Sequence, residues 1–189
     1  RFQGFTESSL KNTDSPKYIL DNAINAQQKL ITGFKGDPRC ERKKWDEANK
    51  PNMVACSLSG EPTMYPYLGE FFEECHKNKM TTFLVTNGTT PEVLKKLDPL
   101  PTQLYVSLIA PSKEIYKKLC IPLISDGWEK IQETLDILSS LNTRTVIRHT
   151  LINQWNIDDK YISQYAKIIK KADPDFVEPK GYVFVGQSR

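Results

Sequence analysis

Short apolar segments rich in β-branched and aromatic residues alternate along this chain with longer segments in which apolar residues recur at helical spacing. The apolar segments are Met53–Leu58, Thr81–Val85, Gln103–Leu108, Arg144–Leu151 and Phe176–Val185. Short runs of this composition predict β-strands. Val54–Leu58 and Phe83–Val85 are apolar at consecutive positions, which is typical of parallel strands covered on both faces. The chain is therefore expected to adopt an α/β fold wound from βα units.

Helix-start signals precede several of the helical segments. N-cap residues, whose side chains can accept a hydrogen bond from a backbone N–H of the first turn, stand at Ser15, Thr90, Ser112 and Asp126. The first two precede a proline, which favours the first helical position, and the last has Glu129 at the spacing of a capping box. Further helices are expected over Tyr67–Lys77 and from about Asp158 to Lys171. The helix after Ser15 should bury one broad face, formed by Ile19, Leu20, Ala23, Ile24, Gln27, Leu30 and Ile31.

The composition is that of a globular protein, and residues 1–189 are expected to form a single domain. Hydrophobic residues make up 39% of the chain and charged residues 26%. No apolar run approaches the roughly 20 residues needed to cross a bilayer, so no membrane contact is expected. The net charge of +3 and the pI of about 8.6 allow binding to a polyanion without requiring it. Any nucleic-acid contact must therefore come from a local patch.

The cysteines lie far apart, at Cys40, Cys56, Cys75 and Cys120, and form no C-x-x-C pair. This spacing argues against both a zinc knuckle and a disulfide framework, and it favours the reducing cytoplasm; no metal-ligating residues are expected in the chain. Cys56 lies in an apolar strand, and Cys75 shares a helix face with Leu68, Phe71 and Phe72. Both cysteines are expected to be buried as small hydrophobic residues.

Polar residues gather at the carboxyl ends of the predicted strands, where proteins built from βα units place their working groups. They are Ser59-Gly60-Glu61-Pro62 after the first strand, Thr86-Asn87-Gly88 after the second, Ser107 in the third, Arg148 in the fourth, and Glu178 and Lys180 in the fifth. Hydroxyls and amides suit sugar oxygens, a carboxylate suits an ammonium group, and an arginine suits a carboxylate. The set favours a zwitterionic, ribose-bearing ligand. Local sequence alone also allows the Gly60 turn and Asn87-Gly88 to be ordinary connections.

Three charged or titratable residues in the last two predicted strands suggest specific roles. Arg148, in a strand interior, needs either a buried partner or a ligand. His149 should face the opposite side by strand alternation and have a structural or exposed role. A desolvated Lys180 would have a lowered pKa and could form a Schiff base with a keto acid, whereas a solvated Lys180 would pair with Glu178.

A charged segment between Gly33 and Trp45 concentrates basic side chains around two aromatic residues. Its cations are Lys35, Arg39, Arg42, Lys43 and Lys44, and a further one, Arg189, ends the chain. This composition suits phosphate contact and base stacking. Because the segment also contains acidic residues, a solvated connecting loop is an alternative interpretation.

Five segments together carry a family resemblance. They are Ser57–Tyr67, Thr82–Thr89, Pro101–Leu108, Thr143–Leu151 and Lys180–Arg189. In the same order, these segments resemble motifs of the archaeal tRNA 4-demethylwyosine synthases, which are radical S-adenosylmethionine (SAM) enzymes of wybutosine biosynthesis. The likeness covers nearly the whole chain and is more specific than any single motif.

The resemblance implies a partial (βα)6 barrel that binds SAM and a 4Fe-4S cluster. Its cofactor site would be formed by Ser59, Gly60, Glu61 and Pro62, which hold the methionyl amino group, together with Thr86, Asn87, Ser107 and Arg148. Lys180 would bind pyruvate or its fragment. The family condenses pyruvate carbons with N1-methylguanosine beside the anticodon of tRNA-Phe, and its cluster is reduced by an external electron donor. Reduction cleaves SAM to a 5′-deoxyadenosyl radical, which abstracts hydrogen from the N1-methyl group.

The chain departs from this family in one major respect, because the cluster motif C-x-x-x-C-x-x-C is not in the sequence. Arg1-Phe2 resembles the residue pair just beyond that motif. The chain is therefore expected to be an inactive fragment that lacks the first strand, the cluster ligands and a C-terminal continuation. Ile109 stands where relatives often have a polar residue, which weakens the expectation of a polar contact there.

Two other functions stay open from the sequence. A Schiff-base lyase of the (βα)-barrel type would use Lys180 without any cluster. A non-catalytic tRNA-binding module would use the basic segment Lys35–Trp45.

Overall fold

The computed structural model describes residues 12–58 and 60–184. Its helices and strands, in chain order, are α1 (Pro16–Ile31), η1 (Thr32–Gly36), α2 (Arg42–Ala48), β1 (Met53–Cys56), η2 (Pro62–Met64), α3 (Leu68–Lys77), β2 (Thr81–Thr86), α4 (Pro91–Leu94), β3 (Gln103–Ser107), α5 (Lys113–Cys120), α6 (Gly127–Ile137), η3 (Leu138–Ser140), β4 (Arg144–Leu151), η4 (Asp159–Tyr161), α7 (Ile162–Ala172) and β5 (Phe176–Gly181), where η marks a 3-10 helix. The predicted α/β alternation is confirmed.

The strands form one parallel sheet of five strands in the order β1-β2-β3-β4-β5, which is also their order in the chain. The register is continuous across the sheet. Phe83 of β2 pairs with Ala55 of β1 and with Gln103 of β3, and Gln103 pairs in turn with Arg144 of β4. Because all strands run the same way, their carboxyl ends meet at one edge of the sheet.

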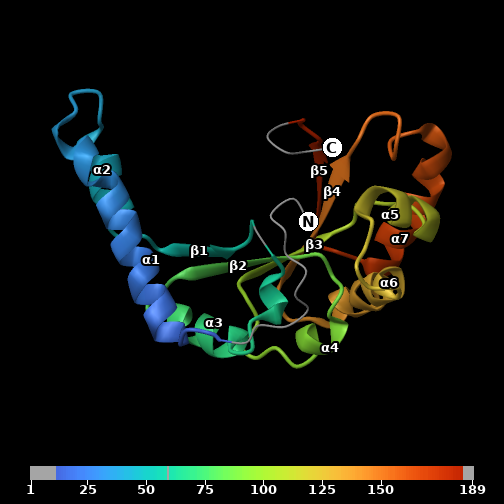
Figure 1. The fold of residues 1–189 in the computed structure, drawn as a ribbon, viewed down its shortest axis with the longest axis horizontal. Coiled ribbons are helices and arrows are strands. Elements are labelled where there is room, and N and C mark those ends of the chain that lie inside the picture. Colours follow the sequence, from blue (N-terminus) through green and yellow to red (C-terminus); the bar gives the residue numbers. More distant parts are fainter. Residues whose placement is uncertain (1–11, 59, 185–189) are drawn as a thin grey trace.

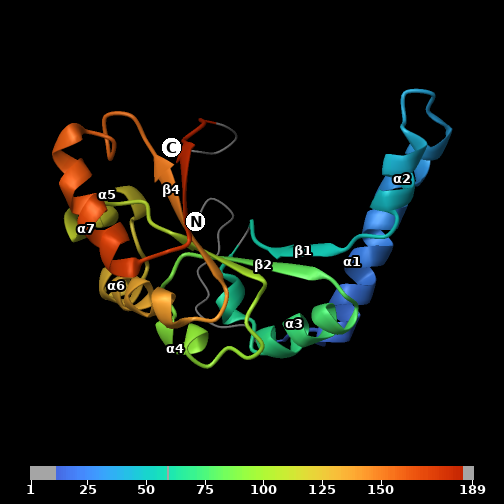
Figure 2. The same ribbon diagram turned by 180° about the vertical axis from the view of Figure 1, so that it is seen from behind.

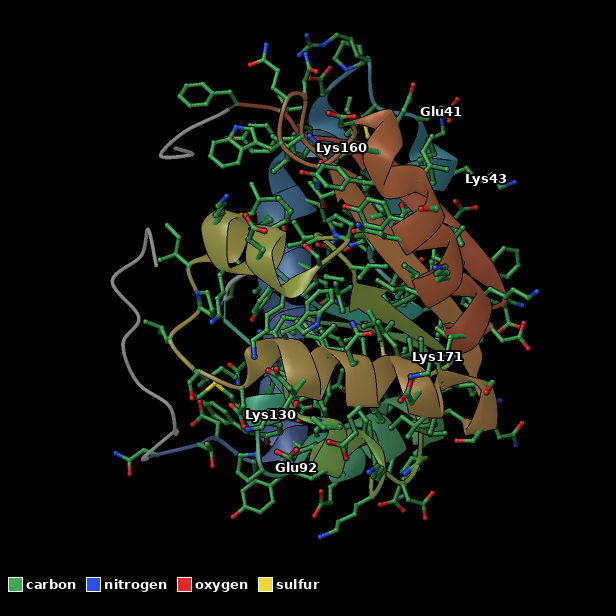
Figure 3. The ribbon with its side chains drawn as sticks, turned by 90° about the vertical axis from the view of Figure 1, so that its right-hand side faces the viewer. Glu41, Lys43, Glu92, Lys130, Lys160 and Lys171 are labelled. Atoms are coloured by element: carbon green, nitrogen blue, oxygen red, sulfur yellow. The ribbon has the colours of Figure 1, made fainter. Side chains whose placement is uncertain are left out.

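The helices that follow the strands cover one face of this curved sheet. Figure 1 shows α3, α4, α6 and α7 along its outer, convex side, and the view from behind in Figure 2 shows the same arrangement. Leu84 and Leu104 point to this side, are 0% exposed, and join one core with Phe72 and Leu135 of the helices. In the side view of Figure 3, α6 and α7 lie in front of the sheet. The core thus lies between the convex face and the helices.

The concave face of the sheet carries half-exposed side chains, including Phe83, Val85 and Tyr105. Burial alternates along β2 and β3. The expectation that the strands are covered on both faces is therefore wrong for the described residues. The consecutive apolar positions arise because part of the concave face is apolar as well, and exposed apolar surface is common in folded proteins.

All four predicted N-cap positions are confirmed, and two of the four side chains make the capping hydrogen bond. Ser15 and Ser112 each accept a hydrogen bond from a backbone N–H of the first turn, both at 3.4 Å. Thr90 and Asp126 occupy N-cap positions, but their side chains make no capping hydrogen bond. The Thr90 hydroxyl instead lies 2.5 Å from that of Thr63, and Asp126 pairs with a lysine one turn later. At these two positions the helix begins as predicted, but the capping hydrogen bond is missing because other partners take the side chains.

The first helix buries less of its apolar face than expected, and the last strand is shorter than expected. Leu20 of α1 is 2% exposed, but Leu30 is 75% exposed. The last turns of α1 extend past the sheet toward α2 (Figure 1), which leaves this part of the predicted face uncovered. β5 ends at Gly181, and Val185 lies outside the described residues. Within residues 12–58 and 60–184, no helix has the length and apolar character needed to span a membrane.

Candidate active site

The turn after β1 brings Glu61 to the carboxyl edge of the sheet. Leu58 and Gly60 have φ angles of +82° and +81°, in the left-handed region that glycine adopts without strain. A Cβ added at Gly60 would meet nothing within 4 Å, so the space beside its backbone is open. Pro62 then starts the short helix η2. Ser59, which belongs to the predicted site, lies outside the described residues.

Donors from two loops hold the Glu61 carboxylate. Its Oε1 accepts hydrogen bonds from the hydroxyls of Thr63 at 2.8 Å and Thr86 at 2.7 Å, and from the N–H of Thr63 at 3.3 Å. Its Oε2 accepts from the N–H of Asn87 at 2.8 Å. The structure therefore brings Glu61 together with Thr86 and Asn87, as the strand-end argument expected, and adds Thr63.

The loop after β2 is internally bonded. The Thr86 side chain is buried, and its Oγ1 also accepts from the N–H of Gly88 at 3.0 Å. Gly88 has a φ of +74°, and its carbonyl accepts from the hydroxyl of Thr134 on α6 at 2.8 Å. The Asn87 carboxamide oxygen accepts from the N–H and the hydroxyl of Thr89 at 2.9 and 2.6 Å. Asn87 thus forms the turn that the sequence left as an alternative, and it reaches Glu61 through its backbone.

Arg148 lies on the concave face, in register with Ser107 on one side and Glu178 on the other. Its Nε donates to Glu178 Oε2 at 2.6 Å, and its guanidinium carbon is 4.4 Å from the centroid of the Tyr105 ring. This strand-interior arginine therefore has an ionic and an aromatic partner. The planar guanidinium carries further N–H donors, so Arg148 can still bind a carboxylate.

Lys180 lies on the same face, nearer the carboxyl edge, where it pairs in register with Thr150. Its side chain is exposed. Glu178, which the sequence offered as the partner of a solvated Lys180, instead forms its ion pair with Arg148 among the described residues. The proposed lysine–glutamate pair is therefore not observed. The exposure of Lys180 also means that burial does not desolvate it in this structure.

His149 faces the opposite side of β4 from Arg148, as strand alternation predicts. It is 5% exposed, and its ring centroid lies 4.1 Å from that of Tyr165 on α7. Burial lowers the pKa of His149, because the charged imidazolium is disfavoured away from water. The residue belongs to the packing between β4 and α7.

Asn156 joins the ends of β3 and β4. It is 0% exposed, and its Nδ2 donates to the carbonyls of Ile109 at 2.6 Å and Thr150 at 2.8 Å. Its Oδ1 accepts from the N–H of Ile152 at 2.6 Å. Ile109 therefore contributes a backbone carbonyl to this strand end, where the sequence comparison had placed a side-chain polar contact in doubt.

Thr63, Thr134 and Asn156 were all missed by the sequence analysis. Thr134 had a usable signal, because it lies within the apolar face of α6 that also contains Ile131 and Leu135. A polar residue on such a face usually has a buried partner. Thr63 lies in the short helix η2 and Asn156 in the turn after β4, and no sequence pattern marks either residue.

The basic arm, residues 29–50, comprises the end of α1, η1 and α2. Three of its predicted cations have acidic partners within the arm, at 2.7 Å for Arg39–Asp37, 3.3 Å for Arg42–Asp46 and 2.8 Å for Lys44–Glu41. Lys35 and Arg42 also lie against the Trp45 ring, 5.4 and 4.9 Å from its centroid. An open hollow of about 1080 Å³ beside α2 is lined in part by Arg42, Lys43, Lys44 and Lys50. Glu41 and Lys43 lie at the surface of the arm (Figure 3), and Arg189 lies outside the described residues.

The described residues offer no metal site, since no group of three or more His, Cys, Asp or Glu side chains among them could hold an ion. Cys56, Cys75 and Cys120 lie on three separate elements, β1, α3 and α5, and burial raises the pKa to about 12 for Cys56 and about 11 for Cys75 and Cys120. These residues therefore do not fit a 4Fe-4S cluster. Glu61 and Arg148 do fit the ammonium and carboxylate groups of SAM.

A curved parallel sheet of βα units with a glycine–glutamate turn at its carboxyl edge defines a class of protein. The family model described as the radical SAM superfamily matches residues 42–166, and the chain belongs to this superfamily. Its members use SAM and a 4Fe-4S cluster. The fold class and the family resemblance inferred from the sequence are both confirmed.

Within that class, the chain is similar to tRNA 4-demethylwyosine synthases. It is 51% identical over 179 residues to the enzyme of that name from Pyrococcus abyssi, which covers 93% of this chain and 52% of the relative. It is 39% identical over 175 residues to TYW1 of Homo sapiens, covering 93% of this chain and 24% of the relative. A solved structure of TYW1 with a lysine-pyruvate adduct bound has a TM-score of 0.83 and 40% identity, covering 91% of this chain and 56% of that one. The chain spans about half the length of the archaeal relative.

Proposed function

We propose that this chain forms the SAM-binding core of a tRNA 4-demethylwyosine synthase, which condenses pyruvate-derived carbons with N1-methylguanosine beside the anticodon of tRNA-Phe. The observation that carries the proposal is the Glu61 carboxylate, held at the carboxyl edge of the sheet by Thr63, Thr86 and Asn87. Glu61 lies in a chain that is 51% identical to a protein named tRNA 4-demethylwyosine synthase. SAM supplies the radical chemistry of the superfamily when it is bound.

The residues of this chain would bind and orient the cofactor. Glu61 would accept hydrogen bonds from the methionyl ammonium group, and Arg148 would bind the carboxylate. Ser107, in register beside Arg148, would offer its hydroxyl to the ribose. The open space beside Gly60 would let the ligand approach the backbone closely. Each of these groups is at or near the carboxyl edge of the sheet.

Lys180 is our candidate for binding pyruvate. It lies on the concave face two positions beyond Glu178 on β5, next to the strand that carries Arg148. The exposed amino group of Lys180 could form a Schiff base with a keto acid. Because Lys180 is exposed in this structure, the proposal requires that the bound substrates or other parts of the complete protein exclude water from its amino group.

The basic arm is our candidate for contact with tRNA. Between Lys29 and Lys50 the sequence has seven basic and four acidic side chains, a net charge of +3 that equals the net charge of the whole chain. Phosphate groups bind such local excess charge, and the Trp45 ring is already flanked by Lys35 and Arg42. The free thiols at Cys40, Cys56, Cys75 and Cys120 suit an enzyme that acts in the reducing cytoplasm.

The cofactor assignment predicts that Glu61→Gln weakens SAM binding by about tenfold or more, because a charge-assisted hydrogen bond to the ammonium is lost. Titration calorimetry on the complete enzyme with its 4Fe-4S cluster in place measures the affinity. Glu92→Gln is the matched control, since Glu92 lies on the helix-covered side (Figure 3) and should leave the affinity unchanged. SAM affinity that is unaltered by Glu61→Gln would contradict the assignment.

The pyruvate assignment is tested by borohydride trapping with labelled pyruvate in the complete enzyme. The expected product is a stable adduct on Lys180 that is missing in Lys180→Ala and retained in Lys171→Ala, whose side chain lies on the convex side and pairs with Asp136. An adduct that survives Lys180→Ala places the reactive lysine elsewhere and removes this role.

The tRNA assignment is tested by reversing the charge of Arg39, Arg42, Lys43 and Lys44 together. We expect tRNA affinity to fall by about tenfold or more at low salt and its salt dependence to become shallower, since fewer counterions are released. Reversal of Lys130 and Lys171, on the convex side in Figure 3, is the control. Equal effects of the two sets in a filter-binding assay would argue against a specific contact by the arm.

A further inference from the structure

The two oxygens of the Glu61 carboxylate accept different numbers of hydrogen bonds. An ionised carboxylate accepts hydrogen bonds at about four positions, two on each oxygen. Oε1 receives the Thr63 hydroxyl, the Thr63 N–H and the Thr86 hydroxyl, at 2.8, 3.3 and 2.7 Å. Oε2 receives only the N–H of Asn87, at 2.8 Å, among the described residues. The open acceptor position is therefore on Oε2.

The directions of the hydroxyl bonds are determined by their other partners. The Thr86 hydroxyl accepts from the N–H of Gly88, so its single hydrogen is available to Glu61. The Thr63 hydroxyl lies 2.5 Å from the Thr90 hydroxyl, and because Thr63 gives its hydrogen to Glu61, Thr90 is the donor to Thr63. Thr63 and Thr86 are 4% and 1% exposed, so neither hydroxyl has water as an alternative partner.

We propose that Thr63 and Thr86 are positioning residues, whose buried hydroxyls occupy Oε1 and turn the carboxylate so that Oε2 alone receives the primary ammonium group of SAM. Neither threonine contacts the cofactor in this scheme. Both act through Glu61, and the arrangement orients the acceptor before the ligand arrives, which reduces the ordering cost of binding. The inference rests on the proposed cofactor site and adds to it the residues that set its geometry.

The test is a double-mutant cycle on SAM affinity, measured by titration calorimetry on the complete enzyme with its 4Fe-4S cluster in place. Thr86→Val keeps the shape of the side chain and removes its hydroxyl, and we expect SAM to bind about tenfold more weakly. Thr86→Ser restores the hydroxyl and should restore the affinity. In a Glu61→Ala background, Thr86→Val should have no further effect, because the residue has nothing left to position.

Thr82→Val is the matched control. Thr82 is a buried threonine on the same face of the same strand, 0% exposed, but its hydroxyl bonds to His76 and Thr102 at the other end of β2. Thr82→Val should lower the free energy of unfolding without changing the affinity for SAM. If Thr86→Val does not fold, Thr63→Val is measured in the same cycle, since Thr63 lies in the η2 turn outside the sheet.

The outcomes separate this inference from the function on which it rests. If the wild-type protein binds no SAM, the proposed function fails. If Glu61→Ala weakens SAM binding but neither Thr86→Val nor Thr63→Val does, the cofactor site stands and the positioning role is overturned. The role is also overturned if Thr86→Val weakens binding equally with and without Glu61.

Discussion

Gly60 and Gly88 have similar backbone angles but different surroundings. Their φ values are +81° and +74°. A Cβ at Gly88 would lie 3.2 Å from Val106 Cγ1 and 3.5 Å from Thr134 Cγ2, whereas a Cβ at Gly60 would meet nothing within 4 Å. Gly60 is open toward the proposed ligand, and Gly88 is packed between β3 and α6.

Alanine substitutions should therefore differ in their cost. Gly60→Ala should lower the free energy of unfolding by about 1 kcal/mol, the strain of a left-handed alanine. Gly88→Ala should lower it by about 2 kcal/mol or more, because overpacking adds to that strain. Urea denaturation measures both values. Equal losses would show that the contacts around Gly88 adjust freely.

His149 gives a second residue-scale prediction, on pH dependence. Because burial lowers its pKa in the folded state below the ordinary 6.5, its stabilising contribution is present above pH 6.5 and is lost as the pH falls through the folded-state pKa. Denaturation curves between pH 7.5 and pH 5 should show this loss in the wild type and a smaller one in His149→Phe. An NMR titration in which the His149 ring protonates above 6.5 would contradict the prediction.

At the scale of elements, a few buried polar side chains connect strand ends that the sheet alone leaves separate. Asn156 bonds to backbone groups of Ile109, Thr150 and Ile152. Thr134 bonds α6 to the turn after β2. These contacts set the relative positions of the loops at the carboxyl edge, where the proposed site lies.

Asn156→Ala should lower the free energy of unfolding by about 3 kcal/mol, since it removes three hydrogen bonds and leaves their backbone partners buried without them. Asn153→Ala, in the same loop but at an exposed position, should change it by less than about 0.5 kcal/mol. Thermal or urea unfolding of the two variants provides the comparison. Similar values would mean that the loop does not depend on the Asn156 bonds.

At the scale of the whole molecule, all the helices that follow strands lie on one side, and the concave face of the sheet stays uncovered in the described part of the chain (Figure 1). Cys75 lies in the core on the convex side, and the half-buried Cys56 and Cys120 pack against that core. Burial raises the pKa of Cys56 to about 12 and of Cys75 and Cys120 to about 11, from an ordinary value of 9.0. The folded state therefore favours the protonated form of these thiols.

This arrangement predicts a loss of stability in alkali. The pKa of each of these three thiols is higher in the folded protein than in the unfolded chain. Their contribution to stability is therefore fully present below pH 9 and is lost as the pH rises through about 11 to 12. The free energy of unfolding should fall between pH 8 and pH 10.5. A variant with alanine at Cys56, Cys75 and Cys120 should show a shallower fall, and an unchanged slope would contradict the assignment to these thiols.

Local patterns were enough to locate most elements and several residues of the proposed site. Arg144–Leu151 matches β4 at both ends, because β-branched composition acts through nearest neighbours. The caps at Ser15 and Ser112 were predictable for the same reason. The positions of Glu61 and Arg148 at strand ends also followed from the chain order of strands and turns.

The sequence by itself determined the βα order, the strand positions and the membership of a radical SAM family, since each rests on local composition or on motifs in linear order. Only the tertiary structure decided which side chains meet. Thr90 bonds to Thr63, 27 residues away, instead of capping its helix. Arg148 meets Tyr105 and Glu178 through the register of three parallel strands. Such pairings depend on strand register and on competition among buried donors and acceptors, which no local pattern encodes.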